Sequence, residues 1–209
     1  MHEVWTDEQQ NDRGCVHVSI NGCIPKLPWN YLADFKVCAM IRFKRLEMEK
    51  PNFSITHKDE AMWELVGKTD QKTLAVWSID CVERVMPYFE EKYPQDHRPR
   101  NAIETLQAWI HTGVFKMAEI RQAALAAHAA AREVGEDNAA RSAARAAGQA
   151  VATAHVPTHA IGAANYALQA IHRATNPSDA DAAVAQERNW QYKRLLDLRA
   201  TYPIYSWIC

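Results

Sequence analysis

Three histidines are the residues of this sequence whose types and spacing point most directly to chemistry. His128 stands in an alanine-rich segment, and His155 and His159 lie four residues apart. Two histidines at that spacing on one helix can share a metal ion, although Pro157 separates the pair and no glutamate completes an HExxH motif. Each imidazole can instead be a buried group that is hydrogen-bonded to a facing Asp, Glu or backbone carbonyl, or can transfer a proton or contact a ligand. The structural role is the favoured interpretation.

A pair of carboxylates forms a second candidate. Asp80 and Glu83 are three residues apart on a predicted helix and are therefore neighbours on one face. Such a pair can ligate a metal or act as acid and base. More often it meets arginines of a neighbouring helix in an ion-pair network. The arginines considered for that network are Arg84, Arg98, Arg100, Arg132, Arg141 and Arg145.

Two arginines at a predicted helix start form a third candidate. Arg98 and Arg100 flank Pro99, and the helix amides together with two guanidinium groups can bind phosphate or carboxylate. Alternatively, Asp96 caps this helix and the arginines pair with Glu83, Glu90 or Glu104. The candidate polar site as a whole consists of Asp80, Glu83, Arg98, Arg100, His128, Arg132, His155 and His159.

The elements that must position these residues are predicted to be helices. Apolar residues recur at steps of three and four over most of the chain, and 27 of the 68 residues from 118 to 185 are alanine, the best helix former. Asp70 fits an N-cap, and Pro87 should kink the following helix or change its last turn. Later helices are expected at about 116–134, 137–156, 158–174 and 178–199, with Pro157 between the second and third.

Small and polar residues within the alanine-rich helices have a predicted place as well. Gly148 and Gly162 are expected to permit close helix crossing. Polar residues at steps of four are expected to form a solvated stripe along one edge. They are Asp137, Arg141, Arg145, Gln149 and Thr153.

The two ends of the chain differ from its centre. Residues 1–27 read as an irregular segment in which a short strand around Val16–Ile20 enters a turn at Asn21–Gly22, a possible small hairpin. A helix is predicted from about residue 29 to 51. The sequence therefore predicts an all-α fold, in which residues 28–209 form a single multi-helix bundle with alanine-rich central helices.

Composition excludes several classes of protein. The formal net charge of −1 argues against a dedicated nucleic-acid binder, which usually carries a basic excess. Five cysteines without CxxC spacing predict a reduced, cytoplasmic protein. Residues 146–172 lack Asp, Glu, Lys and Arg but are mostly alanine with several polar residues, so no membrane span is expected. No cofactor-binding motif is recognised.

A longer pattern carries a family resemblance over roughly residues 70–200. The blocks that carry it are residues 74–90, 94–104, 126–132, 144–160, 166–167, 187–191 and 195–199. Block by block and in order, they are similar to the immunity-five-like putative immunity proteins of bacterial polymorphic toxin systems. The resemblance implies an α-helical, non-catalytic protein that binds and neutralises a cognate protein toxin.

Two alternatives stay open at this point. One is a metal-dependent or acid/base enzyme that uses His128, His155 and His159 with Asp80 and Glu83 in a bundle core. The other is a homo-oligomer whose alanine-rich face packs against its own copy. For a partner-binding protein, aromatic residues outside the expected core are candidate anchors. They are Trp5, Trp29, Tyr202, Tyr205 and Trp207.

Overall fold

The computed structural model describes residues 15–17, 23–25, 53 and 59–201 of the chain. The chain divides into two compact units, Met1–Lys50 and Pro51–Cys209. In the first unit β1 (Cys15–His17) pairs antiparallel with β2 (Cys23–Pro25). The turn predicted at Asn21–Gly22, the helix predicted over 29–51, the boundary near residue 27 and the five aromatic anchors all lie outside the described residues.

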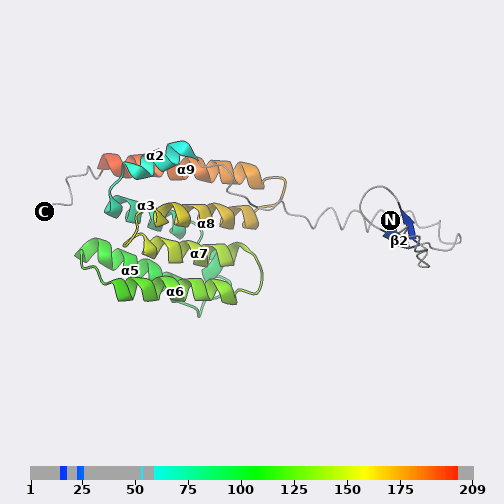
Figure 1. The fold of residues 1–209 in the computed structure, drawn as a ribbon, viewed down its shortest axis with the longest axis horizontal. Coiled ribbons are helices and arrows are strands. Elements are labelled where there is room, and N and C mark those ends of the chain that lie inside the picture. The colour runs from blue at the N-terminus through cyan, green and yellow to red at the C-terminus, as the bar shows by residue number, and fades with distance from the viewer. Residues whose placement is uncertain (1–14, 18–22, 26–52, 54–58, 202–209) are drawn as a thin grey trace, which may run out of the picture. The chain divides into compact units, whose positions relative to one another are not determined.

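The described part of the second unit is entirely helical in its regular structure, which confirms the predicted all-α fold (Figure 1). The helices are α2 (Glu60–Gly67), α3 (Gln71–Glu83), α4 (Pro87–Glu90), α5 (Arg98–Thr112), α6 (Met117–Glu133), α7 (Ala139–Ala152), α8 (His159–Ala174) and α9 (Ala180–Thr201).

Side-chain caps explain where several of these helices begin. The Asp70 carboxylate accepts a hydrogen bond from the Thr73 backbone N–H at 3.0 Å, as its position in the sequence predicted. Asn138 caps α7 in the same way by accepting from the Arg141 N–H at 3.1 Å. Each contact satisfies a backbone donor that the first helical turn leaves without a partner. Gly113 ends α5 with a φ of 68°, a left-handed conformation that glycine adopts without strain.

Two prolines act more strongly than the sequence analysis predicted. The helix that begins after Asp70 does not continue through Pro87 with a kink: α3 ends at Glu83, and Pro87 starts the separate short helix α4. The helix predicted to reach residue 156 ends at Ala152, and a turn that contains Pro157 precedes α8. Proline lacks the N–H that would continue a helix, so its effect reaches back over the preceding turn.

Helix α7 lies at the centre of the helical unit. It packs between α6 and α8, and α8 in turn packs against α9, so that these four helices form a row (Figure 1). Helices α3, α4 and α5 also pack against α7. Every residue of α7 is consequently buried except Ala139, Arg141, Arg145 and Gln149. We call Arg141, Arg145 and Gln149 the α7 stripe.

The alanine-rich composition is what lets so many helices approach α7. Ala143, Ala146, Ala147 and Ala150 are buried within this single chain, where their small side chains allow short distances between helix axes. These four alanines therefore pack within the chain itself. Among the described residues, no helix combines the length and the apolar character that crossing a membrane requires.

Buried hydrogen bonds tie α9 to the rest of the unit. The Trp77 indole N–H donates to the Gln191 carbonyl at 2.8 Å, and the Gln191 side-chain amide donates to the Ala164 carbonyl at 3.1 Å. These contacts join α3, α8 and α9 through groups that would be costly to bury without partners.

Candidate functional site

The imidazole of His128 lies between α6 and α7 with its Nδ1 atom buried. That atom has no hydrogen-bond partner among the described residues. The ring occupies the space that Gly148 leaves open, because a Cβ built at position 148 would lie 2.7 Å from His128 Cε1. The predicted close crossing at Gly148 therefore takes a specific form, in which the glycine makes room for a polar side chain.

A second glycine makes room in the same way one helix further along the row. Gln149 of the α7 stripe lies over Gly162 of α8, whose Cβ would fall 2.7 Å from Gln149 Oε1. The same oxygen lies 2.7 Å from His159 Nδ1, which places the proton of His159 on Nδ1 as the donor. The rings of His155 and His159 are 5.1 Å apart between centroids. His155 itself is exposed.

Burial and positive neighbours set the charge of these histidines. Partial burial lowers the pKa of His128, and the charges of Arg145, Arg132 and His159 lower it further. The pKa of His159 is lowered by burial first and by His155 second. Both rings are therefore neutral at pH 7, the form in which imidazole is easiest to bury. The predicted hydrogen bond to a facing acceptor is not found at the Nδ1 atom of His128, which has no partner among the described residues.

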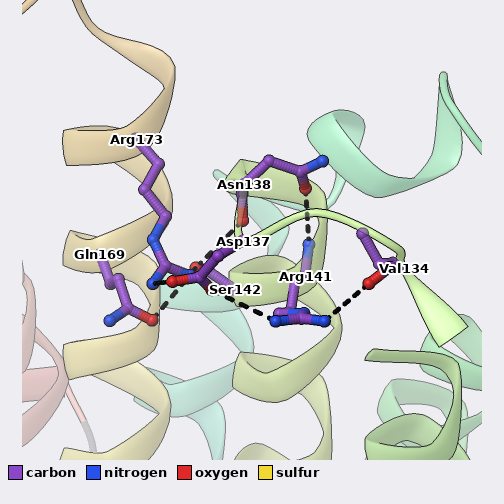
Figure 2. A network of polar contacts seen from close by, with 7 residues as sticks. All are labelled: Val134, Asp137, Asn138, Arg141, Ser142, Gln169 and Arg173. Carbon is purple, nitrogen blue, oxygen red and sulfur yellow. Dashed lines mark hydrogen bonds and ion pairs between the residues drawn. The ribbon is translucent and has the colours of Figure 1, made fainter. Parts of the chain in front are cut away.

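At the N-terminal end of the α7 stripe, polar contacts hold the connection between α6 and α7 in place (Figure 2). Arg141 donates to the Val134 carbonyl at 2.8 Å, and Arg173 of α8 donates to Ser142 Oγ at 2.7 Å and pairs with Asp137. Ser142 donates to Gln169 Oε1 at 3.1 Å. Two guanidinium groups thus hold the connection to α7 and α8, which is a structural task.

The predicted carboxylate pair lies within ion pairs between helices. Asp80 accepts from Arg194 of α9 at 2.8 Å, and Glu83 pairs with Arg100 of α5, which also contacts Glu90 at 2.8 Å. This agrees with the ion-network interpretation. The partner of Asp80 was missing from the arginines that the sequence suggested.

The arginines at the start of α5 are occupied as well. Arg98 pairs with Asp96 at 2.7 Å and with Glu133 of α6. Asp96 also accepts from the backbone N–H of Arg98 at 3.1 Å. These carboxylates take the positions that a bound anion would need, so the helix start acts as a joint between α5 and α6.

The structure consequently gathers four of the eight candidates around the histidines, while Glu83 and Arg100 pair with each other elsewhere. His128, Arg132, His155 and His159 belong to one cluster over α6, α7 and α8, whereas Asp80, Glu83, Arg98 and Arg100 are used elsewhere. Within residues 59–201 and the other described positions, no three His, Cys, Asp or Glu side chains are grouped to hold a metal ion. The enzyme alternative, which needed the histidines beside the carboxylates, gains no support.

Sequence reasoning missed two members of this cluster, Arg145 and Gln149. Their spacing of four was recognised but interpreted as a solvated edge. In the structure both are half-buried, and Thr153, at the end of the same series, is fully buried. The signal that could have found them is the position of Gly148 next to Gln149, because a glycine inside a helix often marks a close approach by another group.

Comparison with known proteins adds one finding. No curated protein and no solved structure matches this chain. The family model described as "Imm-5 like putative immunity protein" matches residues 64–198, which include all of α3 to α8 and most of α9. That match spans more than half of the chain and contains the whole histidine cluster, so the protein belongs to the Imm-5 like putative immunity protein family.

Proposed function

We propose that this protein is a non-catalytic immunity protein that binds and neutralises a cognate bacterial toxin in the cytoplasm of the cell that makes both. The observation that carries the proposal is the family match over residues 64–198. The match extends over almost the whole helical unit. The family assignment therefore rests on the entire helical fold and not on one short motif.

The chemistry of the candidate groups also favours binding over catalysis. The carboxylates that could act as acid or base are paired with arginines, which occupy their oxygen atoms and compete with any substrate. A helical bundle whose helices are joined by ion pairs is suited to present a fixed surface to a partner. A standard protein–protein interface needs about 800 Å² from each partner.

The direct test is protection of cells. Each toxin domain encoded beside this gene is expressed from an inducible promoter in a sensitive bacterial host, with and without the full-length protein. We expect this protein to restore growth with one of these toxin domains and to co-purify with it at a 1:1 ratio. A protein that protects against none of them would contradict the proposal.

The metal content of the purified, untagged protein separates the proposal from the enzyme alternative. A near-stoichiometric metal that is lost in a His155→Ala/His159→Ala variant with an unchanged circular dichroism spectrum would favour the enzyme. Binding of the protected toxin domain in vitro by a preparation treated with a chelator and dialysed would favour the binding role, because occlusion of a toxin needs no metal.

A further inference from the structure

The arginines of the described chain fall into two groups. Seven of them form ion pairs with carboxylates: Arg84, Arg98, Arg100, Arg141, Arg173, Arg188 and Arg194. Within the described residues, four have neither an ion pair nor a hydrogen bond from the guanidinium group. Three of these, Arg121, Arg132 and Arg145, lie on the neighbouring helices α6 and α7, and the fourth, Arg199, lies near the end of α9.

The three unpaired arginines of α6 and α7 share one side of the bundle. Steps of four and three residues place Met117, Arg121, Leu125, His128 and Arg132 along one face of α6. Arg145 precedes Gly148 by three residues on α7, and Gly148 contacts the His128 ring. The name α6 edge is used below for the five residues of α6 together with Arg145: Met117, Arg121, Leu125, His128, Arg132 and Arg145. The lowered pKa of His128, to which both Arg132 and Arg145 contribute, agrees with this placement.

Apolar side chains alternate with the arginines on this edge. Leu125 is 58% exposed and Met117 is 46% exposed, although both belong to residue types that usually avoid water. Arginine and methionine are enriched in protein–protein interfaces, and arginine is among the residues that carry most binding energy there. The alternation therefore has the composition of an interface.

The helices that carry the α6 edge, and α8 beside them, offer its arginines no free carboxylate. The chain has no Asp or Glu between Asp137 and Asp179, so neither α7 nor α8 supplies a carboxylate. The acidic residues of α6 and of the connection that follows it are already engaged with other partners. The pairs are Glu119–Lys116, Glu133–Arg98, Glu136–Lys92 and Asp137–Arg173. A chain with a net charge of −1 thus concentrates free positive charge on one edge.

We propose that the α6 edge is the surface through which the protein binds its partner, and that the partner is a protein that presents Asp and Glu carboxylates beside apolar side chains. This inference rests on the proposed function for the nature of the partner. Each unpaired guanidinium can bind a carboxylate through two parallel hydrogen bonds, while Leu125 and Met117 bury apolar area against the partner. A nucleic acid fits less well, because its binding surfaces carry a larger basic excess and gain nothing from an exposed leucine.

The test on the complex uses charge reversal with a matched control. Arg121→Glu and Arg132→Glu each reverse one exposed cation of the α6 edge, and the double variant reverses both. Arg199→Glu is the control for each single variant, because it reverses one arginine, half-buried, on α9. In the toxin protection assay and in titration calorimetry with the protected toxin domain, we expect the double variant to lose at least about tenfold in affinity, and the control less than about twofold. Arg145→Gln, which is milder at a half-buried position, should weaken binding in the same direction. Equal affinity of the double variant and the wild type would overturn the proposal.

An independent probe separates failure of this inference from failure of the proposed function. Full-length ¹⁵N-labelled protein is titrated with a synthetic peptide of alternating Glu and Leu, and with a Lys–Leu peptide of equal length. We expect only the acidic peptide to shift the resonances of Arg121, Leu125, Arg132 and Arg145. Larger shifts on α9, equal shifts from both peptides, or tighter binding of a single-stranded oligonucleotide to the same residues would overturn the inference even where protection is seen. If no toxin is neutralised but the acidic peptide binds here, the surface stands and the proposed function fails.

Discussion

The imidazole of His128 fills the space above Gly148, whose absent Cβ would lie 2.7 Å from His128 Cε1 and 2.9 Å from both ring nitrogens. This relationship couples two helices of the row: α7 can carry a Cβ at this position only if the His128 ring of α6 moves. It also explains why a glycine stands inside a helix in which most other residues are alanine, although glycine costs about 1 kcal/mol there.

Gly148→Ala should therefore destabilise the protein. A methyl group at this position must displace a part-buried ring, and overpacking of this kind costs about 1–3 kcal/mol, more than the better helix propensity of alanine returns. We expect the free energy of unfolding to fall by about 1 kcal/mol in urea denaturation. In a His128→Ala background the same change should instead stabilise, because the ring is gone.

The matched control is Gly67→Ala at the end of α2, where an added Cβ would meet no atom within 4 Å. This change should leave the free energy of unfolding unchanged or raise it slightly. A Gly148→Ala protein as stable as the Gly67→Ala protein would show that the His128 ring moves away without cost.

Local signals explain which parts of the fold could be predicted from the sequence. The N-cap at Asp70, the end of α5 at Gly113 and the break near Pro157 depend on residues within one helical turn. The separation of α3 from α4 was missed, because the apolar spacing continues through Pro87 to Phe89 and hides the interruption of the backbone hydrogen bonds.

The site was harder to predict, because its contacts join distant positions. Asp80 pairs with Arg194, a partner 114 residues away, and several arginines in between looked equally suitable. The histidine cluster depends on which faces of α6, α7 and α8 meet, and alanine-rich helices give little apolar contrast from which to infer a face. The arginines without an ion pair could be recognised only once the structure showed which arginines pair with which carboxylates.

Arg84→Ala should be among the more damaging single changes in the bundle. Glu187 is only 3% exposed and binds Arg84 through several hydrogen bonds of 2.7–3.0 Å, while the guanidinium lies 4.0 Å from the centre of the Trp190 ring. Without Arg84 a carboxylate stays buried and unpaired. We expect a loss of about 1–3 kcal/mol in chemical denaturation, less than for a fully buried pair, since Arg84 is partly exposed.

Two comparisons test whether the buried carboxylate is the cause. Lys68→Ala breaks the ion pair with Glu64, in which both side chains are exposed, and should leave the free energy of unfolding almost unchanged because water screens that pair. Arg84→Met/Glu187→Leu removes both charges and should be more stable than Arg84→Ala alone. If the double variant is the less stable of the two, packing of Arg84 on Trp190 is the main contribution instead.

Stability should decrease as the pH falls below about 6.5. The pKa values of His128 and His159 are lowered in the folded protein from their ordinary value of 6.5. Between 6.5 and those lower values the unfolded chain binds protons that the folded chain does not, so acid favours unfolding. The slope can reach at most about 1.4 kcal/mol per pH unit for each ring and should be smaller here, because both rings are partly exposed to water.

Urea denaturation at pH 7.5, 6.5 and 5.5 measures this dependence above the range in which most carboxylates titrate. His128→Gln cannot take up the proton and should flatten the decrease between pH 6.5 and 5.5. His111, an exposed histidine whose ring nitrogen lies 2.8 Å from the Gln107 carbonyl on its own helix, offers the control: His111→Gln should leave the slope unchanged. An identical slope in all three proteins would place the pH dependence elsewhere.

Gln149→Glu should raise the pKa of His159, which is lowered in the wild-type protein. Gln149 Oε1 lies 2.7 Å from His159 Nδ1, and a carboxylate at that distance stabilises the imidazolium form. We expect the pKa of His159 to rise by at least about one unit in an NMR titration of the imidazole proton signals. The decrease in stability between pH 6.5 and 5.5 should become shallower in parallel, because the folded protein now binds the proton too.

The matched change is Gln169→Glu, one helix along the row, where the side-chain oxygen accepts from Ser142 near Arg173 (Figure 2). It adds the same charge ten residues further along α8 from His159 and should leave the pKa of His159 within a few tenths of its wild-type value. Equal shifts in both variants would mean that the added charge acts over a long range, whereas a shift in Gln149→Glu alone requires the direct contact across α7 and α8. In that case His159 is held at a fixed place beside the α6 edge, and the positive charge there is set by arginines alone at neutral pH.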